Sequence, residues 1–202
     1  SLVGSVFAFT HLGIAGILIR EIAGQREQAG QYIANALGIR LLITIPLGIG
    51  VSLLLGWVLG FSATTLWVIL GVGVFVALTN ISGIFYGAFE ALNRFEKEAF
   101  YVFLYWVSAL TLCILSLKIG YGLTGVIGAI VVGQGVAILL SGREVSSWIC
   151  PISVRVNAKF WSRFIRASLP LALAGALEFA NLRLDTVMIG YFHDEVSVGI
   201  YN

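Results

Sequence analysis

Charge is what this sequence has least of. Only 11% of its 202 residues are Asp, Glu, Lys or Arg, whereas an ordinary soluble domain has about 25%. The 12 basic and 10 acidic residues give a formal net charge of +2, which is small for a nucleic-acid-binding protein. With only two cysteines and two histidines, the chain has neither a disulfide framework nor the ligand spacing of a metal site.

Long apolar runs make up most of the sequence between the few charged residues. The chain is 59% hydrophobic with a mean hydropathy of +0.99, and a spanning helix needs roughly 20 apolar residues. Six segments qualify, at about 2–19, 36–61, 65–92, 100–119, 122–142 and 169–192. The sequence therefore predicts an all-α, polytopic transmembrane bundle, with a kink at Pro46 in the second span.

The basic residues are unevenly distributed between these runs. Ten of the twelve lie in three stretches: Arg20, Arg26 and Arg40; Arg94 and Lys97; and Arg143, Arg155, Lys159, Arg163 and Arg166. The alternate gaps, near Gly60 and Gly120, are nearly uncharged. Because cytoplasmic loops of membrane proteins are enriched in Lys and Arg, we expect the basic stretches to be cytoplasmic.

Aromatic residues agree with this orientation. Residues 159–166 alternate aromatic and basic side chains, which predicts a short helix lying in the inner interface. Tyrosine and tryptophan are enriched at both membrane interfaces. We expect Tyr32, Tyr101, Trp148 and Trp161 at the inner one, and Trp57, Trp67, Tyr121 and Tyr191 at the outer one.

The sixth span contains most of the candidate functional residues: Glu178, Asn181, Arg183 and Asp185. A charge at the bilayer centre is unfavourable by about 2.5–3.5 kcal/mol, so these side chains will not face lipid. At 100° per residue, the two acids and Asn181 share one face, whereas Arg183 points away from Asp185. We interpret this span as the wall of a hydrated cavity. The alternative is an interhelical ion pair that only holds the bundle together.

Three more polar residues lie within other spans. His11 in the first span is a candidate cavity or proton-linked residue, or a hydrogen-bonded packing residue. Asn80 and Gln134, in the third and fifth spans, are interpreted as hydrogen-bond contacts between helices. Asn80 is also a candidate for contact with a substrate in the cavity.

Motifs of soluble enzymes are missing from this sequence. It has no phosphate-binding Walker loop, no paired-histidine zinc motif and no nucleophile elbow. The longest polar segment, 143–168, contains a single acid, Glu144, which weighs against a membrane glycosyltransferase or ligase. We therefore expect a protein that is not an enzyme and has no cofactor or metal.

Several short stretches occur in a characteristic order: Leu12-Gly13-Ile14 with 19–23, Asn35-Ala36-Leu37 with 40–42, 88–95, Leu169-Pro170-Leu171, and 184–190 followed by 198–201. In this order and spacing they resemble the polysaccharide (O-antigen type) flippase family of the multidrug/oligosaccharidyl-lipid/polysaccharide exporter superfamily. The resemblance covers the whole chain. One departure is His11, which stands where the family often has an acid.

The resemblance implies an architecture of 12–14 helices in two lobes. On that template, residues 1–168 would form spans two to six, most of the first lobe. Residues 169–202 would contain the first span of the second lobe. We therefore expect the chain to be a segment of a longer protein with helices missing on both sides.

The resemblance also implies a function. The protein would move a polyprenyl-pyrophosphate-linked oligosaccharide between leaflets of the prokaryotic plasma membrane by alternating access. Arg183, Asn181 and Asn80 would contact the substrate, and Asp185, Glu178 and His11 would bind the coupling Na⁺ or H⁺. The lipid bilayer is the other expected partner, and no nucleic acid is expected.

Three alternatives stay open at this stage. A multidrug cation antiporter of the same superfamily would favour an acidic and aromatic pocket, against which Arg183 argues. A peptidoglycan-precursor flippase is closer in chemistry. A non-transporting membrane scaffold would pair its intramembrane polar residues tightly with one another and leave no hydrated cavity.

Overall fold

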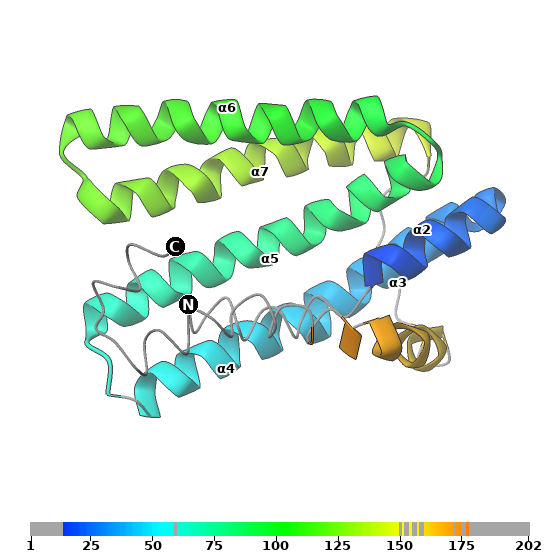
Figure 1. The fold of residues 1–202 in the computed structure, drawn as a ribbon, viewed down its shortest axis with the longest axis horizontal. Coiled ribbons are helices and arrows are strands. Elements are labelled where there is room, and N and C mark those ends of the chain that lie inside the picture. Colours follow the sequence, from blue (N-terminus) through cyan, green and yellow to red (C-terminus); the bar gives the residue numbers. More distant parts are fainter. Residues whose placement is uncertain are drawn as a thin grey trace.

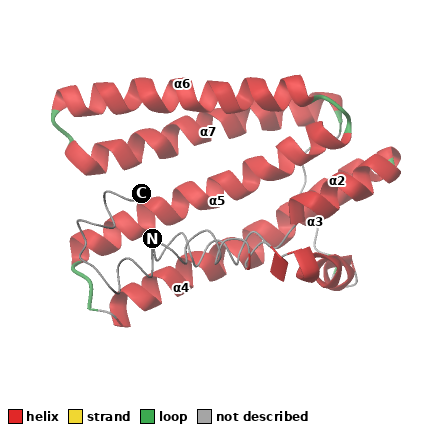
Figure 2. Cartoon of the chain, in the orientation of Figure 1, coloured by secondary structure: helices red, strands yellow, loops and turns green. Residues whose placement is uncertain are grey.

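The computed structural model describes residues 14–58, 60–149, 151, 154, 157, 160–171, 173–174 and 177. These residues form helices joined by short turns, with no strand among them (Figure 1, Figure 2). In chain order the named helices are α2 (Ile14–Gly24), α3 (Ala29–Ile39), α4 (Ile45–Val58), α5 (Ala63–Ala91), α6 (Phe95–Ile119) and α7 (Gly122–Trp148). The predicted all-α class is confirmed for this part of the chain.

Four continuous helical stretches are long and apolar enough to cross a membrane. They are Arg26–Val58, Thr65–Ala91, Phe95–Ile119 and Gly122–Trp148. In Figure 1 the α6–α7 hairpin lies on one side of α5, and the line of α3 and α4 lies on the other. α5 is therefore the central helix of the described bundle.

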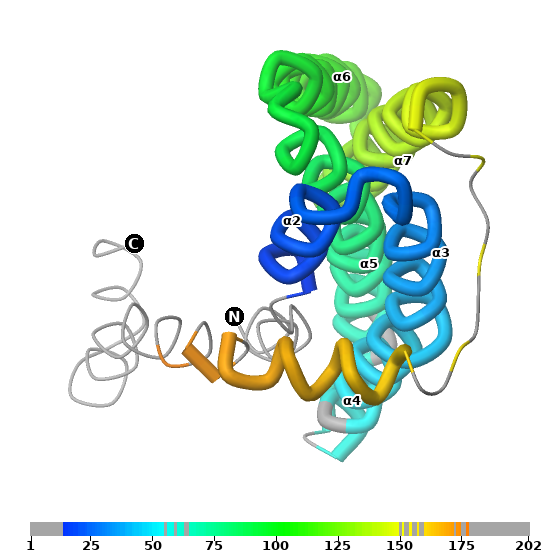
Figure 3. The backbone as a smooth tube through the Cα atoms, turned by 90° about the vertical axis from the view of Figure 1, so that its right-hand side faces the viewer, coloured from blue at the N-terminus to red at the C-terminus, as the bar shows by residue number. Residues whose placement is uncertain are grey.

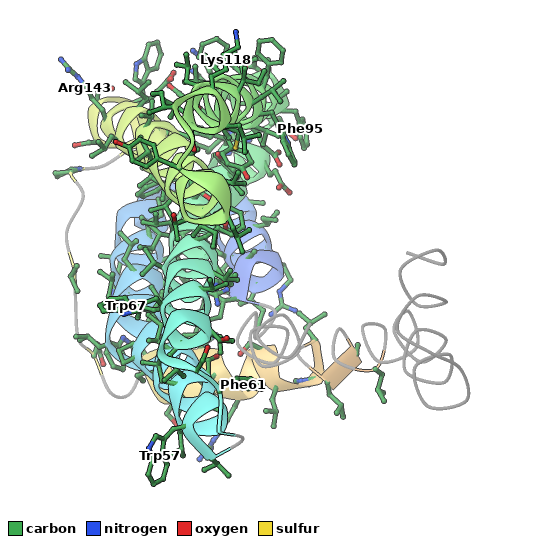
Figure 4. The ribbon with its side chains drawn as sticks, turned by 90° about the vertical axis from the view of Figure 1, so that its left-hand side faces the viewer. Trp57, Phe61, Trp67, Phe95, Lys118 and Arg143 are labelled. Atoms are coloured by element: carbon green, nitrogen blue, oxygen red, sulfur yellow. The ribbon has the colours of Figure 1, made fainter. Side chains whose placement is uncertain are left out.

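The two ends of this bundle differ in charge. The α5–α6 turn, the end of α7 and the α2–α3 junction lie at one end (Figure 1), which includes Arg20, Arg94, Lys97 and Arg143 and is called the basic end below. The α4–α5 and α6–α7 turns lie at the opposite end, called the neutral end. Figure 4, which views the neutral end, shows Trp57 and Lys118 pointing away from the bundle.

Local sequence signals end the long helices where the chain must turn. After α5, Asn93 has a φ of 58° and the Arg94 N–H donates to the Phe89 carbonyl at 2.8 Å. After α6, Gly120 has a φ of 91° and the Tyr121 N–H donates to the Ser116 carbonyl at 3.1 Å. Both turns are Schellman motifs, which satisfy the last carbonyls of a helix.

The second span contains a π-helical turn just before Pro46, where the sequence predicted a kink. Arg40–Thr44 is π-helical, with the Ile45 N–H bonded to the Arg40 carbonyl, and it joins α3 to α4 without a break. Pro46 follows at once; it has no N–H, and its ring would clash with the carbonyl four residues earlier in a regular helix. Widening the preceding turn accommodates the proline.

The main apolar core lies at the basic end. α2, α3 and the last turns of α5 supply fully buried side chains such as Leu18, Ile33, Ile84 and Phe89. By contrast, α6 exposes Phe103 (66%) and Trp106 (63%) together with other large apolar side chains. Such a surface is expected of a helix that faces lipid.

A further helix over residues 160–171, called the transverse helix here, packs on this core. The Phe160 ring lies 5.4 Å from that of Tyr32, and the Trp161 Nε1–H donates to Asn35 Oδ1 at 3.2 Å. Figure 3 shows it running across the bundle instead of along it. The sequence predicted a short helix at 159–166 in this orientation. The structure extends it through Pro170 to Leu171.

Other boundaries differ from the predicted ones at charged residues. α6 begins at Phe95 and α7 runs on to Trp148, whereas hydropathy placed these ends at residues 100 and 142. Tyr32 and Tyr101 are both buried in the core at the basic end, at 8% and 6% exposure, and their position at the inner interface stays a prediction. Charged residues support helix as well as apolar ones do, so hydropathy underestimates helix length.

Candidate functional site: polar residues buried between the spans

Asn80 is a polar residue buried in the middle of α5. Its side chain is 2% exposed, and neither Oδ1 nor Nδ2 has a hydrogen-bond partner in the described part of the chain. It belongs to a buried line that includes Ile69, Ala77, Ile84 and Gly87. A buried amide without partners costs about 1–3 kcal/mol, so this position calls for a water or a ligand.

Gln134 of α7 is a buried amide in the same bundle that does have a hydrogen-bond partner. Its Nε2 donates to Ser82 Oγ of α5 at 2.8 Å, and both residues are buried. This hydrogen bond between helices confirms the structural interpretation of Gln134. Asn80, two residues before Ser82, has no such hydrogen bond to another helix among the described residues. Its amide is therefore not explained by helix packing in the way that the Gln134 amide is.

A second buried polar line runs along the Arg26–Val58 span. Arg40, Thr44, Ser52 and the glycines Gly48 and Gly56 recur at every fourth residue, and all are buried. The Thr44 hydroxyl donates to the Ile39 carbonyl at 3.4 Å, and the Ser52 hydroxyl to the Gly48 carbonyl at 2.8 Å. These hydroxyls are satisfied by their own helix, as serine and threonine often are in membrane helices.

Arg40 is the charged member of this line. Sequence analysis counted it among the basic residues expected on the cytoplasmic side, although it also lies within the predicted span 36–61. The structure describes it inside a helix of spanning length, with 3% of its surface exposed. A charge inside a span faces the protein interior.

Asn80 and Thr44 lie at nearly the same depth. A Cβ added at Gly56 of α4 would lie 3.2 Å from Ile69 Cδ1 of α5, which fixes the register of these antiparallel helices. Thr44 precedes Gly56 by 12 residues and Asn80 follows Ile69 by 11. At 1.5 Å per residue, both are about 16–18 Å from that contact.

The remaining predicted site residues lie outside the described part of the chain: His11, Glu178, Asn181, Arg183 and Asp185. Their roles, and the shared face of the sixth span, stay predictions. Of the six candidates, the structure therefore describes Asn80 alone. Among the described residues, no group of three His, Cys, Asp or Glu side chains could hold a metal ion.

Comparison with known proteins decides the family. The family model described as "Polysaccharide biosynthesis protein" matches residues 1–202. The chain belongs to this family. No curated protein and no solved structure matches. Its family, that of the polysaccharide and O-antigen flippases, consists of membrane-embedded proteins, which agrees with the four apolar helices of spanning length.

In this family member, the basic end is held together by polar contacts between helices. Lys97 Nζ of α6 lies 2.8 Å from Glu144 Oε1 of α7, and the Tyr101 hydroxyl donates to the other oxygen of Glu144. The Arg94 guanidinium lies 4.7 Å from the ring centre of Trp148. Glu144 is therefore engaged in packing α6 on α7, and sequence analysis did not predict its partners.

Proposed function

We propose that this protein is a lipid-linked oligosaccharide flippase. In this proposal it moves a polyprenyl-pyrophosphate glycan from the cytoplasmic to the outer leaflet of the prokaryotic plasma membrane, and the basic end faces the cytoplasm. It is a transporter and not an enzyme. The observation that carries the proposal is the amide of Asn80, which is buried within a spanning helix of a polysaccharide-family chain and has no hydrogen-bond partner among the described residues.

The chemistry of the cargo explains the need for such an amide. Sugar hydroxyls lose their hydrogen bonds to water when the headgroup enters a low-dielectric membrane. An amide offers a donor and an acceptor side by side, which matches a hydroxyl that both donates and accepts. Asn80 satisfies these hydroxyls only while substrate is present, since no protein group occupies its polar atoms in the described chain.

The sixth span supplies the rest of the proposed mechanism. Arg183 and Asn181 are the further substrate contacts, and Glu178, Asp185 and His11 bind the coupling Na⁺ or H⁺. Ion binding at a midplane site would bias the cavity between inward-open and outward-open states. The lipid tail of the substrate stays in the bilayer throughout.

The alternative functions fit the chain less well. A multidrug cation antiporter would favour an acidic and aromatic pocket without an arginine, so Arg183 of the sixth span argues against it. A scaffold would pair its intramembrane amides, as Gln134 does with Ser82, and it would gain nothing from the unpaired Asn80.

Complementation of a glycan-export-deficient strain with the full-length protein tests the proposal. We expect wild type to restore surface glycan and Asn80→Leu, which keeps the shape but removes the amide, to reduce it strongly at equal membrane abundance. Thr79→Val is the matched control, because the Thr79 hydroxyl donates to the Phe75 carbonyl of its own helix. Full glycan export by Asn80→Leu would refute a substrate role for Asn80, and failure of wild type to restore any glycan would refute the flippase.

A further inference from the structure

The transverse helix has one face that packs on the protein and another that carries positive charge. Phe160, Phe164 and Ser168 recur at every fourth residue and face the bundle, and the last two of them are buried at 4% and 0% exposure. Arg163 and Arg166 are exposed. The apolar spacing is that of an amphipathic helix, and its outer face presents two guanidinium groups.

This helix lies at the level of the lipid headgroups. It runs across the bundle at the basic end (Figure 3) and contacts Asn35 of the spanning stretch Arg26–Val58 through Trp161. Trp57, 73% exposed at the neutral end, is expected at the opposite interface, where tryptophan is enriched. A hydrocarbon core of about 30 Å takes up about 20 helical residues. Counted back from Trp57, that core ends just before Asn35 is reached, so the transverse helix lies just outside it.

The two arginines of the outer face are not neutralised by the protein around them. No Asp or Glu occurs in the sequence over residues 145–177. Glu21 of α2 lines a small cavity together with Arg163, but its carboxylate is paired with Arg20 at 3.1 Å. In the described part of the chain, neither Arg163 nor Arg166 forms a salt bridge. Their charge is therefore available to an anion outside the protein.

We propose that the outer face of the transverse helix binds the headgroups of anionic glycerophospholipids in the leaflet at the basic end. The charges are complementary: a guanidinium bonds the oxygens of a lipid phosphate, and each basic residue near an anionic membrane surface raises affinity about fivefold. Leu169 and Leu171, which follow on the same segment, are 61% and 50% exposed and suit contact with the acyl chains. This inference does not depend on what the protein transports.

Lipid binding at this face would hold the transverse helix on the bundle. The helix packs on α3 through the Phe160 and Tyr32 rings and through the hydrogen bond from Trp161 to Asn35. A headgroup on its outer face adds an attraction from the other side. The anionic lipid content of the membrane therefore sets how firmly the segment that leads into the predicted sixth span is seated on α3.

Amide hydrogen exchange of the full-length protein in lipid nanodiscs tests this assignment. The nanodiscs contain phosphatidylcholine alone or with phosphatidylglycerol, and no polyprenyl lipid. We expect exchange in residues 160–171 of wild type to be about five- to twentyfold slower with phosphatidylglycerol, and about 1 M salt to abolish the difference. Arg163→Gln and Arg166→Gln should each reduce it, and the double variant should remove most of it. The two Arg→Lys variants should retain most of it, because they keep the charge.

Lys118→Gln is the matched control, since it removes one exposed positive charge at the neutral end. It should keep the full lipid effect, and unchanged exchange in α5 shows that each variant is folded. Equal exchange of wild type in the two lipid mixtures would overturn the proposal, and so would a full phosphatidylglycerol effect in the folded double variant. Slower exchange that appears only after addition of a polyprenyl pyrophosphate would also overturn it, because the arginines would then bind the carrier. Glycan export is not the readout, so the result is independent of the flippase proposal.

Discussion

Lys97 of α6 and Glu144 of α7 form a salt bridge of 2.8 Å at the basic end of the bundle. Glu144 also accepts from the Tyr101 hydroxyl, and Tyr101 stacks on Phe89 of α5 with ring centres 5.9 Å apart. Glu144 thus holds α7 on α6, and the Tyr101 ring extends the contact to α5. The partly exposed lysine means that solvent weakens this contact, so its contribution is modest.

A double-mutant cycle measures that contribution. We expect Lys97→Ala and Glu144→Ala each to lower the free energy of unfolding, with a coupling of about 1 kcal/mol between them. Thermal unfolding in detergent micelles provides the readout. A parallel cycle of Lys97→Ala with Glu96→Ala, an exposed neighbour, should give no coupling; equal coupling in the two cycles would contradict a specific pair.

The two buried amides should respond in opposite ways to apolar substitution. Gln134→Met removes the hydrogen bond to Ser82 and should destabilise the protein by about 1 kcal/mol. Asn80→Leu removes an amide that has no partner in the part of the chain that the structure describes, and it should leave stability unchanged or raise it. Unfolding measurements on both variants, beside glycan export, separate a structural amide from a functional one. A clear loss of stability in Asn80→Leu would count against this distinction.

Gly133 of α7 marks the closest approach of two spanning helices. A Cβ at this position would lie 3.0–3.1 Å from the backbone N, Cα and Cβ of Ala109 in α6. Backbone cannot move aside cheaply, so Gly133→Ala should destabilise by about 1–3 kcal/mol.

Gly135 of the same helix is the matched control. A Cβ there would meet nothing within 4 Å, and alanine favours helix over glycine. Gly135→Ala should therefore be neutral or stabilising in the same unfolding assay. Equal effects of the two substitutions would mean that the Gly133 contact has no special role.

Trp161 fastens the transverse helix to α3. Trp161→Phe keeps an aromatic ring but removes the Nε1–H that bonds to Asn35, whose side chain is 1% exposed. We expect a loss of about 1 kcal/mol and faster amide hydrogen exchange in residues 160–171. Trp57→Phe at the exposed neutral end should change neither quantity, and unaltered exchange in Trp161→Phe would rule out the fastening role.

The existence of the spans could be predicted from sequence because apolar length is a direct requirement of the bilayer. The prediction of 65–92 differs from α5 (Ala63–Ala91) by only a residue or two at each end. Arg40 shows the limit of the method. Hydropathy averages over a window and does not tell which way one side chain points, so it placed Arg40 within the span 36–61 without indicating that its side chain is buried.

The hydrogen-bond partners of the polar residues could not be predicted from the sequence either. Gln134 and Ser82 are 52 residues apart, and Trp161 and Asn35 are 126 apart. Such pairs depend on helix register and rotation, which are set by close contacts such as that of Gly133 with Ala109. A sequence pattern identifies the residues that need partners, but it does not identify the partners.

The α6–α7 hairpin has a mechanical consequence for the proposed transport. Its helices meet at the basic end through Lys97 and Glu144, at mid-length through Gly133 and Ala109, and near the neutral end through Gly125 and Ser116. Contacts at these three levels oppose sliding of one helix past the other. In the proposed flippase the hairpin therefore moves as one rigid unit, and the rearrangement that opens a path for cargo falls to the helices around it.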